Sequence, residues 1–148
     1  MIQEWSTLEK FIFDTNGGKL LNIEEDKECR EYLGYNFQLG NQQVKFRKAK
    51  VTPKKIGQFV TLWKRNLVGQ TVPFDIEDGF DSYIIMASDA HRTGFFVFPK
   101  AILVRMGILS SKDSAGKRGF RLYPRWDTPV NSQAMRTQKW QDEYFIDI

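Results

Sequence analysis

The 148-residue sequence is poor in the residues that form disulfides and zinc sites: it has one cysteine, Cys29, and one histidine, His91. A single cysteine excludes a disulfide within the chain and is typical of a reducing compartment. A structural zinc site needs four Cys or His ligands, so this composition excludes one. Carboxylates at positions 24, 25, 26, 28 and 31 flank Cys29 and disfavour the thiolate that a catalytic nucleophile needs.

Long apolar runs are also missing. No stretch approaches the roughly 18 apolar residues of a membrane span, and the N-terminal sequence MIQEWSTLEKF lacks the apolar core of a signal peptide. We therefore expect a cytoplasmic protein with no membrane partner. A glycine-rich phosphate loop is absent too. The segment GKRGFR (116–121) has two glycines, but their spacing matches neither the Walker A loop nor the dinucleotide-binding fingerprint.

Acidic residues are absent between Glu31 and Asp75, where eight basic residues lie in a protein whose net charge is only +4. Like charges repel, so folding alone gives no reason to gather them, whereas a polyanion gains from the release of its counterions. The eight residues are Lys45, Arg47, Lys48, Lys50, Lys54, Lys55, Lys64 and Arg65.

Aromatic residues of the kind that stack on bases, Phe46, Phe59 and Trp63, are interleaved with these charges. A second basic set lies in and after a flexible, glycine-containing loop and comprises Lys117, Arg118, Arg121 and Arg125. The alternatives are a solvated edge strand protected by its lysines and an ordinary surface loop.

The pattern of apolar residues predicts one domain over residues 1–148, of the α/β (α+β) class, with a mixed, mostly antiparallel sheet flanked by helices. Two strands joined by the turn Gly40-Asn41 are typical of a hairpin. Asn131 is a candidate helix cap. We expect helices over 2–14, 22–33, 99–106 and 132–145, and strands over 35–39, 44–51, 58–64, 82–87, 94–98 and 120–123.

The strand 44–51 breaks its own alternation, because Val44 and Phe46 have one parity and Ala49 and Val51 the other. We expect a β-bulge near Arg47 that brings these four apolar residues onto one buried side. Such a bulge would leave the basic residues of the strand mostly facing solvent.

Five segments of unusual composition cover nearly all of the chain beyond the first helix: VKFRKAKVTPKKIGQFVTLWKR (44–65), FDSYIIMA (80–87), FVFPKAIL (96–103), GKRGFRLYPRW (116–126) and TQKWQDEYF (137–145). On these segments the chain resembles the MepB family, named after a small cytoplasmic protein encoded beside a multidrug efflux pump and its repressor. The resemblance implies a cytoplasmic domain. We further expect the family's fold to be similar to the restriction-endonuclease-like core.

A nuclease of that fold needs carboxylates for Mg²⁺ and a lysine on adjacent strands. Two positions before Lys50 and Lys64, where an acidic ligand is expected, the chain has Lys48 and Leu62. The usual site is therefore degenerate. Substitutes exist in the acidic helix predicted over 22–33 and in the segment 75–81, which carries Asp75, Glu77, Asp78 and Asp81.

We expect a nucleic-acid-binding protein, with double-stranded DNA favoured over RNA, that contacts the phosphate backbone and has no cofactor. The expected contacts are Lys45, Arg47, Lys48, Lys50, Lys54, Lys55, Lys117, Arg118, Arg121 and Arg125. One alternative is a Mg²⁺-dependent nuclease whose catalytic candidates are Asp75, Asp78, Asp81 and Lys64 (or Lys50). Another is a protein-interaction module with an acidic partner.

Overall fold

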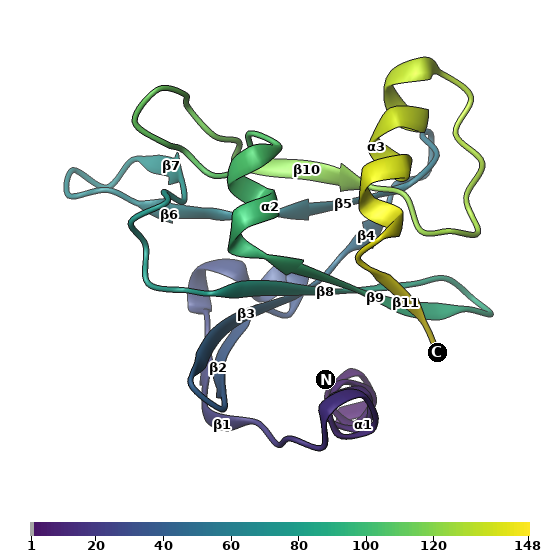
Figure 1. Ribbon diagram of the computed structural model, residues 1–148, viewed down its shortest axis with the longest axis horizontal. Helices are drawn as coiled ribbons and strands as arrows, with labels where there is room; N and C mark the ends of the chain where they lie inside the picture. The colour runs from purple at the N-terminus through teal and green to yellow at the C-terminus, as the bar shows by residue number, and fades with distance from the viewer. Residues whose placement is uncertain (1) are drawn as a thin grey trace.

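The computed structural model describes residues 2–148 and shows a mixed α+β domain (Figure 1). In chain order its elements are α1 (Ile2–Asn16), β1 (Leu21–Glu25), the 3-10 helix η1 (Lys27–Tyr32), β2 (Tyr35–Leu39), β3 (Gln42–Lys48), β4 (Lys50–Val51), β5 (Gln58–Thr61), β6 (Trp63–Arg65), β7 (Thr71–Pro73), β8 (Ser82–Ser88), β9 (Thr93–Pro99), α2 (Lys100–Arg105), β10 (Gly119–Leu122), α3 (Ser132–Asp142) and β11 (Phe145–Asp147). No helix within the described residues is long and apolar enough to cross a membrane.

Six strands form the main sheet in the order β1-β2-β3-β8-β9-β11. All pairs are antiparallel except β3 with β8, which confirms the predicted mixed, mostly antiparallel sheet. A three-stranded sheet, β10-β5-β4, and the two-stranded pair β6-β7 lie apart from it in the strand order. Figure 1 shows α1 below the main sheet and the small sheets, α2 and α3 above it.

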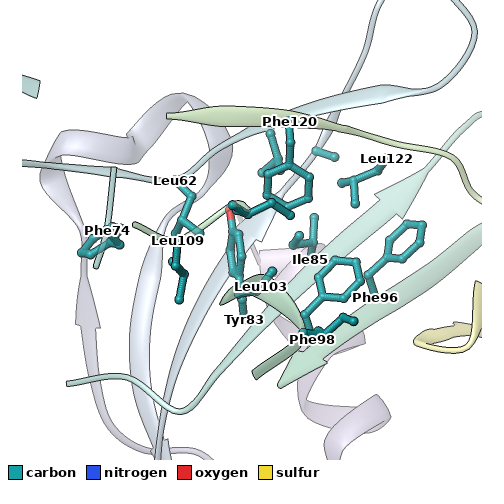
Figure 2. Packing of buried hydrophobic residues seen from close by; sticks show 14 of the residues in the cluster. Leu62, Phe74, Tyr83, Ile85, Phe96, Phe98, Leu103, Leu109, Phe120 and Leu122 are labelled. Atoms are coloured by element: carbon teal, nitrogen blue, oxygen red, sulfur yellow. The ribbon is translucent and has the colours of Figure 1, made fainter. Parts of the chain in front are cut away.

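The central strand β8 is buried on both faces, as its continuous apolar sequence predicts. Tyr83 and Ile85 join the core above the sheet, whereas Ile84 and Met86 join the core that α1 covers below it. The upper core is rich in aromatic rings, with Phe96 and Phe98 stacked at 5.6 Å between centroids (Figure 2). The main sheet therefore separates two cores and serves as a rigid platform for the small sheet.

The predicted helix over 22–33 is wrong: this segment forms β1 and then η1. An amphipathic helix needs an apolar stripe to bury, and Cys29 is the only buried residue between positions 21 and 33. The edge strand β1 pairs with β2 instead. Asp26 then caps η1 by accepting a hydrogen bond from the Glu28 N–H at 3.1 Å, and Leu33 ends it in the left-handed conformation.

The predicted bulge near Arg47 is also wrong. Strand β3 pairs regularly with β8 as far as Lys48, and the chain then leaves the main sheet at Ala49, whose N–H donates to the Met86 carbonyl oxygen. The next two residues pair with β5 in the small sheet. Changing sheets explains the broken alternation without an extra residue, and Val51 is 59% exposed rather than buried.

Two further boundaries differ from the prediction. The strand expected over 58–64 is divided into β5 and β6 at Leu62, whose N–H donates to the Arg118 carbonyl oxygen. The helix expected over 132–145 ends at Asp142, and the last residues form β11 beside β9. The predicted cap is confirmed, since the Asn131 side chain accepts from the Ala134 N–H at 2.8 Å.

Candidate nucleic-acid interface

A groove with a volume of about 700 Å³ lies between the small sheet, α3 and the chain that follows α2. We call it the cationic groove. Four cationic side chains line it, Lys54, Lys55, Lys117 and Arg121, and among the described residues no carboxylate does. Two of the lysines follow β4, whereas Lys117 and Arg121 lie in the loop before β10 and in β10 itself. The two basic stretches that the sequence analysis singled out thus meet at this groove.

Arg121 holds the two stretches together. Its Nη2 donates to the Thr52 Oγ1 at 2.6 Å and to the Ile56 carbonyl oxygen at 3.0 Å, so the guanidinium clamps both ends of the turn that carries Lys54 and Lys55. The Thr52 hydroxyl also donates to the Lys55 carbonyl oxygen at 3.2 Å. The clamp fixes where the two lysines stand and keeps the charge of Arg121 at the groove.

A close backbone approach positions Lys117. A Cβ on Gly116 would lie only 2.4 Å from the Ile108 carbonyl oxygen and 2.6 Å from the Ser110 nitrogen, so only glycine fits here. The Lys117 N–H donates to that same Ile108 oxygen at 2.9 Å. This part of the loop is therefore tied to the chain that follows α2, and Lys117 is presented at the groove.

The first turn of α3 adds a favourable dipole. Asn131, Gln133 and Ala134 line the groove, and they belong to the end of the helix where backbone N–H groups carry partial positive charge. The partial positive charge of this helix end therefore adds to the cationic side chains at the part of the groove beside the first turn of α3.

The basic residues of β3 and β4 lie elsewhere, and the protein's own carboxylates neutralise most of them. Lys48 pairs with Glu4 of α1 at 3.3 Å, and Lys50 pairs with Glu31 at 2.9 Å. Lys64 and Arg65 pair with Asp78 and Glu28 in the same way, at 2.8 and 2.7 Å. The local excess of charge seen in the sequence is thus largely compensated in space.

Arg47 does not face solvent, contrary to the prediction. Its side chain is 1% exposed, and its Nη2 donates to the Asp26 carboxylate at 2.6 Å while its Nη1 donates to the Phe46 carbonyl oxygen at 2.7 Å. Because Phe46 faces α1, its neighbour Arg47 faces the upper side of the main sheet, which η1 covers. Arg47 therefore cannot reach a phosphate.

Lys45, on the same upper face of β3, lines a second cavity of about 250 Å³. Its Nζ donates to Asn36 Oδ1 at 3.2 Å and lies 4.4 Å from the centroid of the Phe74 ring. Burial, together with the positive charge of Arg47, lowers the pKa of Lys45 to about 8. This lysine thus sits in a cavity of its own, apart from the cationic groove.

Two arginines of the second basic set are also outside the groove lining. Arg125 is bound by two carboxylates, Asp142 at 2.7 Å and Asp147 at 2.9 Å, which raise its pKa. Arg118 is exposed, and its Nη1 lies 3.5 Å from the Thr71 hydroxyl. Arg125 therefore ties α3 to β11, whereas Arg118 remains open to solvent.

The carboxylates of the segment 75–81 stabilise the loop. Asp75 accepts from the Glu77 N–H at 2.8 Å, and Asp81 accepts from the Gln43 N–H at 2.8 Å. Burial alone would raise the pKa of Asp78, but hydrogen bonds from Lys64 and the Asp75 N–H outweigh it and the pKa is lowered. Among residues 2–148 no three His, Cys, Asp or Glu side chains stand close enough together to hold a metal ion.

Sequence reasoning missed the aromatic part of the groove. Phe59 was noted as one of three interleaved aromatics, but Phe46 is fully buried and only Phe59 of the three lines the groove. Tyr123 also lines it. Two glycines could have pointed to these rings in the sequence. Gly119 lies against the ring of Phe59, and Gly57 lies against the ring of Tyr123.

The geometry can be set beside known proteins. A profile of the family described as MepB-like matches residues 26–147. A solved structure described as the crystal structure of MepB is similar to this chain with a TM-score of 0.86 and 34% sequence identity, covering 97% of this chain and 96% of that one. A search among curated proteins found no match.

Proposed function

We propose that this chain, which belongs to the MepB-like family, binds nucleic acid by holding its phosphate backbone in the cationic groove. The proposal depends mainly on one observation: four cationic side chains from two distant stretches of the chain line the same groove. Among the described residues, no carboxylate lines it. DNA is the polymer that we expect, and the cytoplasm is the compartment in which we place the protein.

The charge balance around the groove supports an anionic ligand. Elsewhere most lysines of the basic stretch are paired with carboxylates, yet Lys54, Lys55 and Lys117 form no ion pair within residues 2–148 and are exposed. Gathering cationic groups without counter-charges costs electrostatic energy, and a polyanion would offset that cost through counterion release.

Removing these three charges should abolish most of the affinity. We expect the Lys54→Gln, Lys55→Gln, Lys117→Gln triple variant to bind a fluorescein-labelled DNA strand roughly 100-fold more weakly in anisotropy titrations, at about 1 kcal/mol for each lost phosphate contact. The three side chains are exposed, so the variant should unfold at the same temperature as the wild type.

A matched control removes the same amount of charge from outside the groove. Lys10, Lys19 and Lys27 are exposed and do not line the groove, and their triple replacement by glutamine should change the affinity less than about 3-fold. Equal losses in the two triple variants would mean that net charge alone governs binding, and the proposal would then be wrong.

A further inference from the structure

The second cavity, between β3 and the loop that follows β7, has no role in the proposed function. Its volume of about 250 Å³ is slightly below the roughly 300–1,000 Å³ of pockets for drug-sized ligands. Lys45 lines it together with the aromatic side chains Phe74 and Phe80 and the polar side chains Asn36 and Asp78. Apolar walls with a few polar groups and one ionisable amine are the composition of a site for a small ligand.

The amine of Lys45 has no carboxylate partner within residues 2–148. Its Nζ donates to the Oδ1 of Asn36 at 3.2 Å, and these two residues are paired across β2 and β3. Ring faces supply much of its remaining surroundings, since Nζ lies 4.4 Å from the centroid of Phe74 and 5.6 Å from that of Phe80. One acceptor and two rings replace only part of the water that an ammonium group loses on burial.

The carboxylate that lines the cavity is held by other donors. Asp78 accepts from the Lys64 Nζ at 2.8 Å and from the Asp75 N–H at 2.7 Å. These bonds fix the loop that forms one wall of the cavity. Phe74 and Phe80, on the same loop, pack edge to face with 5.7 Å between ring centroids. The cavity is therefore formed before any ligand binds, as small-molecule sites usually are.

Charged groups around the cavity set the protonation of the amine. Arg47, on the same face of β3, disfavours a second positive charge, and Lys100 of α2 approaches the Phe80 ring to 5.4 Å from its centroid. Three groups favour the charged amine, each with a smaller effect than Arg47: Asp26, Asp78 and the Cys29 thiol. With burial, the balance leaves the pKa of Lys45 at about 8. At pH 7 about a tenth of this amine is then neutral, against about one part in 3,000 for an ordinary lysine.

We propose that Lys45 is a nucleophilic amine and that the second cavity takes a small aldehyde, which the amine captures as an imine. The Nζ lone pair attacks the carbonyl carbon, a C–N bond forms, and the electron pair of the C=O bond moves to oxygen. The nitrogen then loses both of its protons, the oxygen leaves with them as water, and a C=N bond remains. Lysines that are desolvated, or that lie beside another cation, are the ones that form such Schiff bases. This inference does not depend on the proposed function.

Reductive labelling of the full chain tests the capture. The probe is propanal at pH 7 with sodium cyanoborohydride, which reduces the imine to a stable propyl amine, and peptide mass mapping gives the rate at each lysine. We expect Lys45 to be labelled about 10-fold faster than Lys27, which is exposed, because its larger neutral fraction outweighs the lower nucleophilicity of a less basic amine. A rate at Lys45 no higher than that at Lys27 would overturn the inference.

A change of probe tests whether the cavity is the site. Oxidised dextran carries its aldehydes on a polymer that is too large for a cavity of about 250 Å³. We therefore expect dextran to label Lys27 and to leave Lys45 unmodified under conditions in which propanal labels Lys45 first. Labelling of Lys45 by dextran as fast as that of Lys27 would show an accessible amine in place of a cavity site, and would contradict the inference.

A pair of variants assigns the fast reaction to one residue. Lys45→Met keeps the length of the side chain but has no amine, so the rapid addition of the first propyl group, seen in the intact mass, should disappear. Lys27→Met is the matched control and should retain it. Rapid addition that persists in Lys45→Met would assign the reaction to another amine, and the inference would then be wrong.

Discussion

Replacing Asp26 with alanine should destabilise the folded protein by about 3–5 kcal/mol, because it leaves the buried guanidinium of Arg47 without its counter-charge. Arg47 is 1% exposed and Asp26 is 19% exposed, and 2.6 Å separates Nη2 from Oδ2. The Arg47 Nε already lacks a partner among the described residues, so little else could compensate. Urea unfolding followed by circular dichroism measures the loss.

Two further variants isolate the ion pair from the capping role of Asp26. Arg47→Met removes the charge together with its cost, so the Asp26→Ala, Arg47→Met double variant should be more stable than Asp26→Ala alone. Glu25→Ala breaks only the exposed pair with Arg30 and should cost less than about 1 kcal/mol. If the double variant recovers none of the lost stability, the loss comes from the missing cap of η1, and our account of the ion pair is wrong.

Replacing Lys45 with methionine should stabilise the protein at neutral pH, by on the order of 2–3 kcal/mol. The pKa of Lys45 is about 8 in the folded protein, below its ordinary value of 10.5. Between these values the unfolded chain binds more protons than the folded one, so wild-type stability rises with pH across this window. Methionine has no charge to bury and avoids the cost.

The gain from Lys45→Met should therefore shrink as the pH rises from 8 towards 10. Urea unfolding of both proteins at pH 7 and near pH 10 measures it. Lys27→Met serves as the control, because Lys27 is exposed and its replacement should change stability little at either pH. A gain that stays constant with pH would contradict the assigned protonation of Lys45.

Local patterns were sufficient to predict much of the fold. The continuous apolar run of β8, the turn at Gly40-Asn41 and the cap at Asn131 each depend on neighbouring residues, and each is confirmed. The predictions failed where a distant partner decides the structure. The sequence near Arg47 does not reveal that η1 covers that face of the sheet, and β11 is too short to show a pattern of its own.

The candidate site was predicted in the same uneven way. The sequence analysis named ten contact residues in two basic stretches, and four of the ten line the groove: Lys54, Lys55, Lys117 and Arg121. Charge counts along a chain cannot tell a lysine that faces solvent from one such as Lys48, which pairs with Glu4 of α1. The role of Arg121 as a clamp depends on contacts distant in sequence, since its partners lie in the turn after β4.

The salt dependence of binding tests the central claim most directly. Each phosphate contact with a single strand contributes a slope of about −0.7 to a plot of log affinity against log salt concentration. If Lys54, Lys55, Lys117 and Arg121 each hold a phosphate, the wild type should give a slope of about −3, and the triple lysine variant a slope of about −1. A wild-type slope near zero, or equal slopes for the two proteins, would contradict binding of the phosphate backbone in the cationic groove.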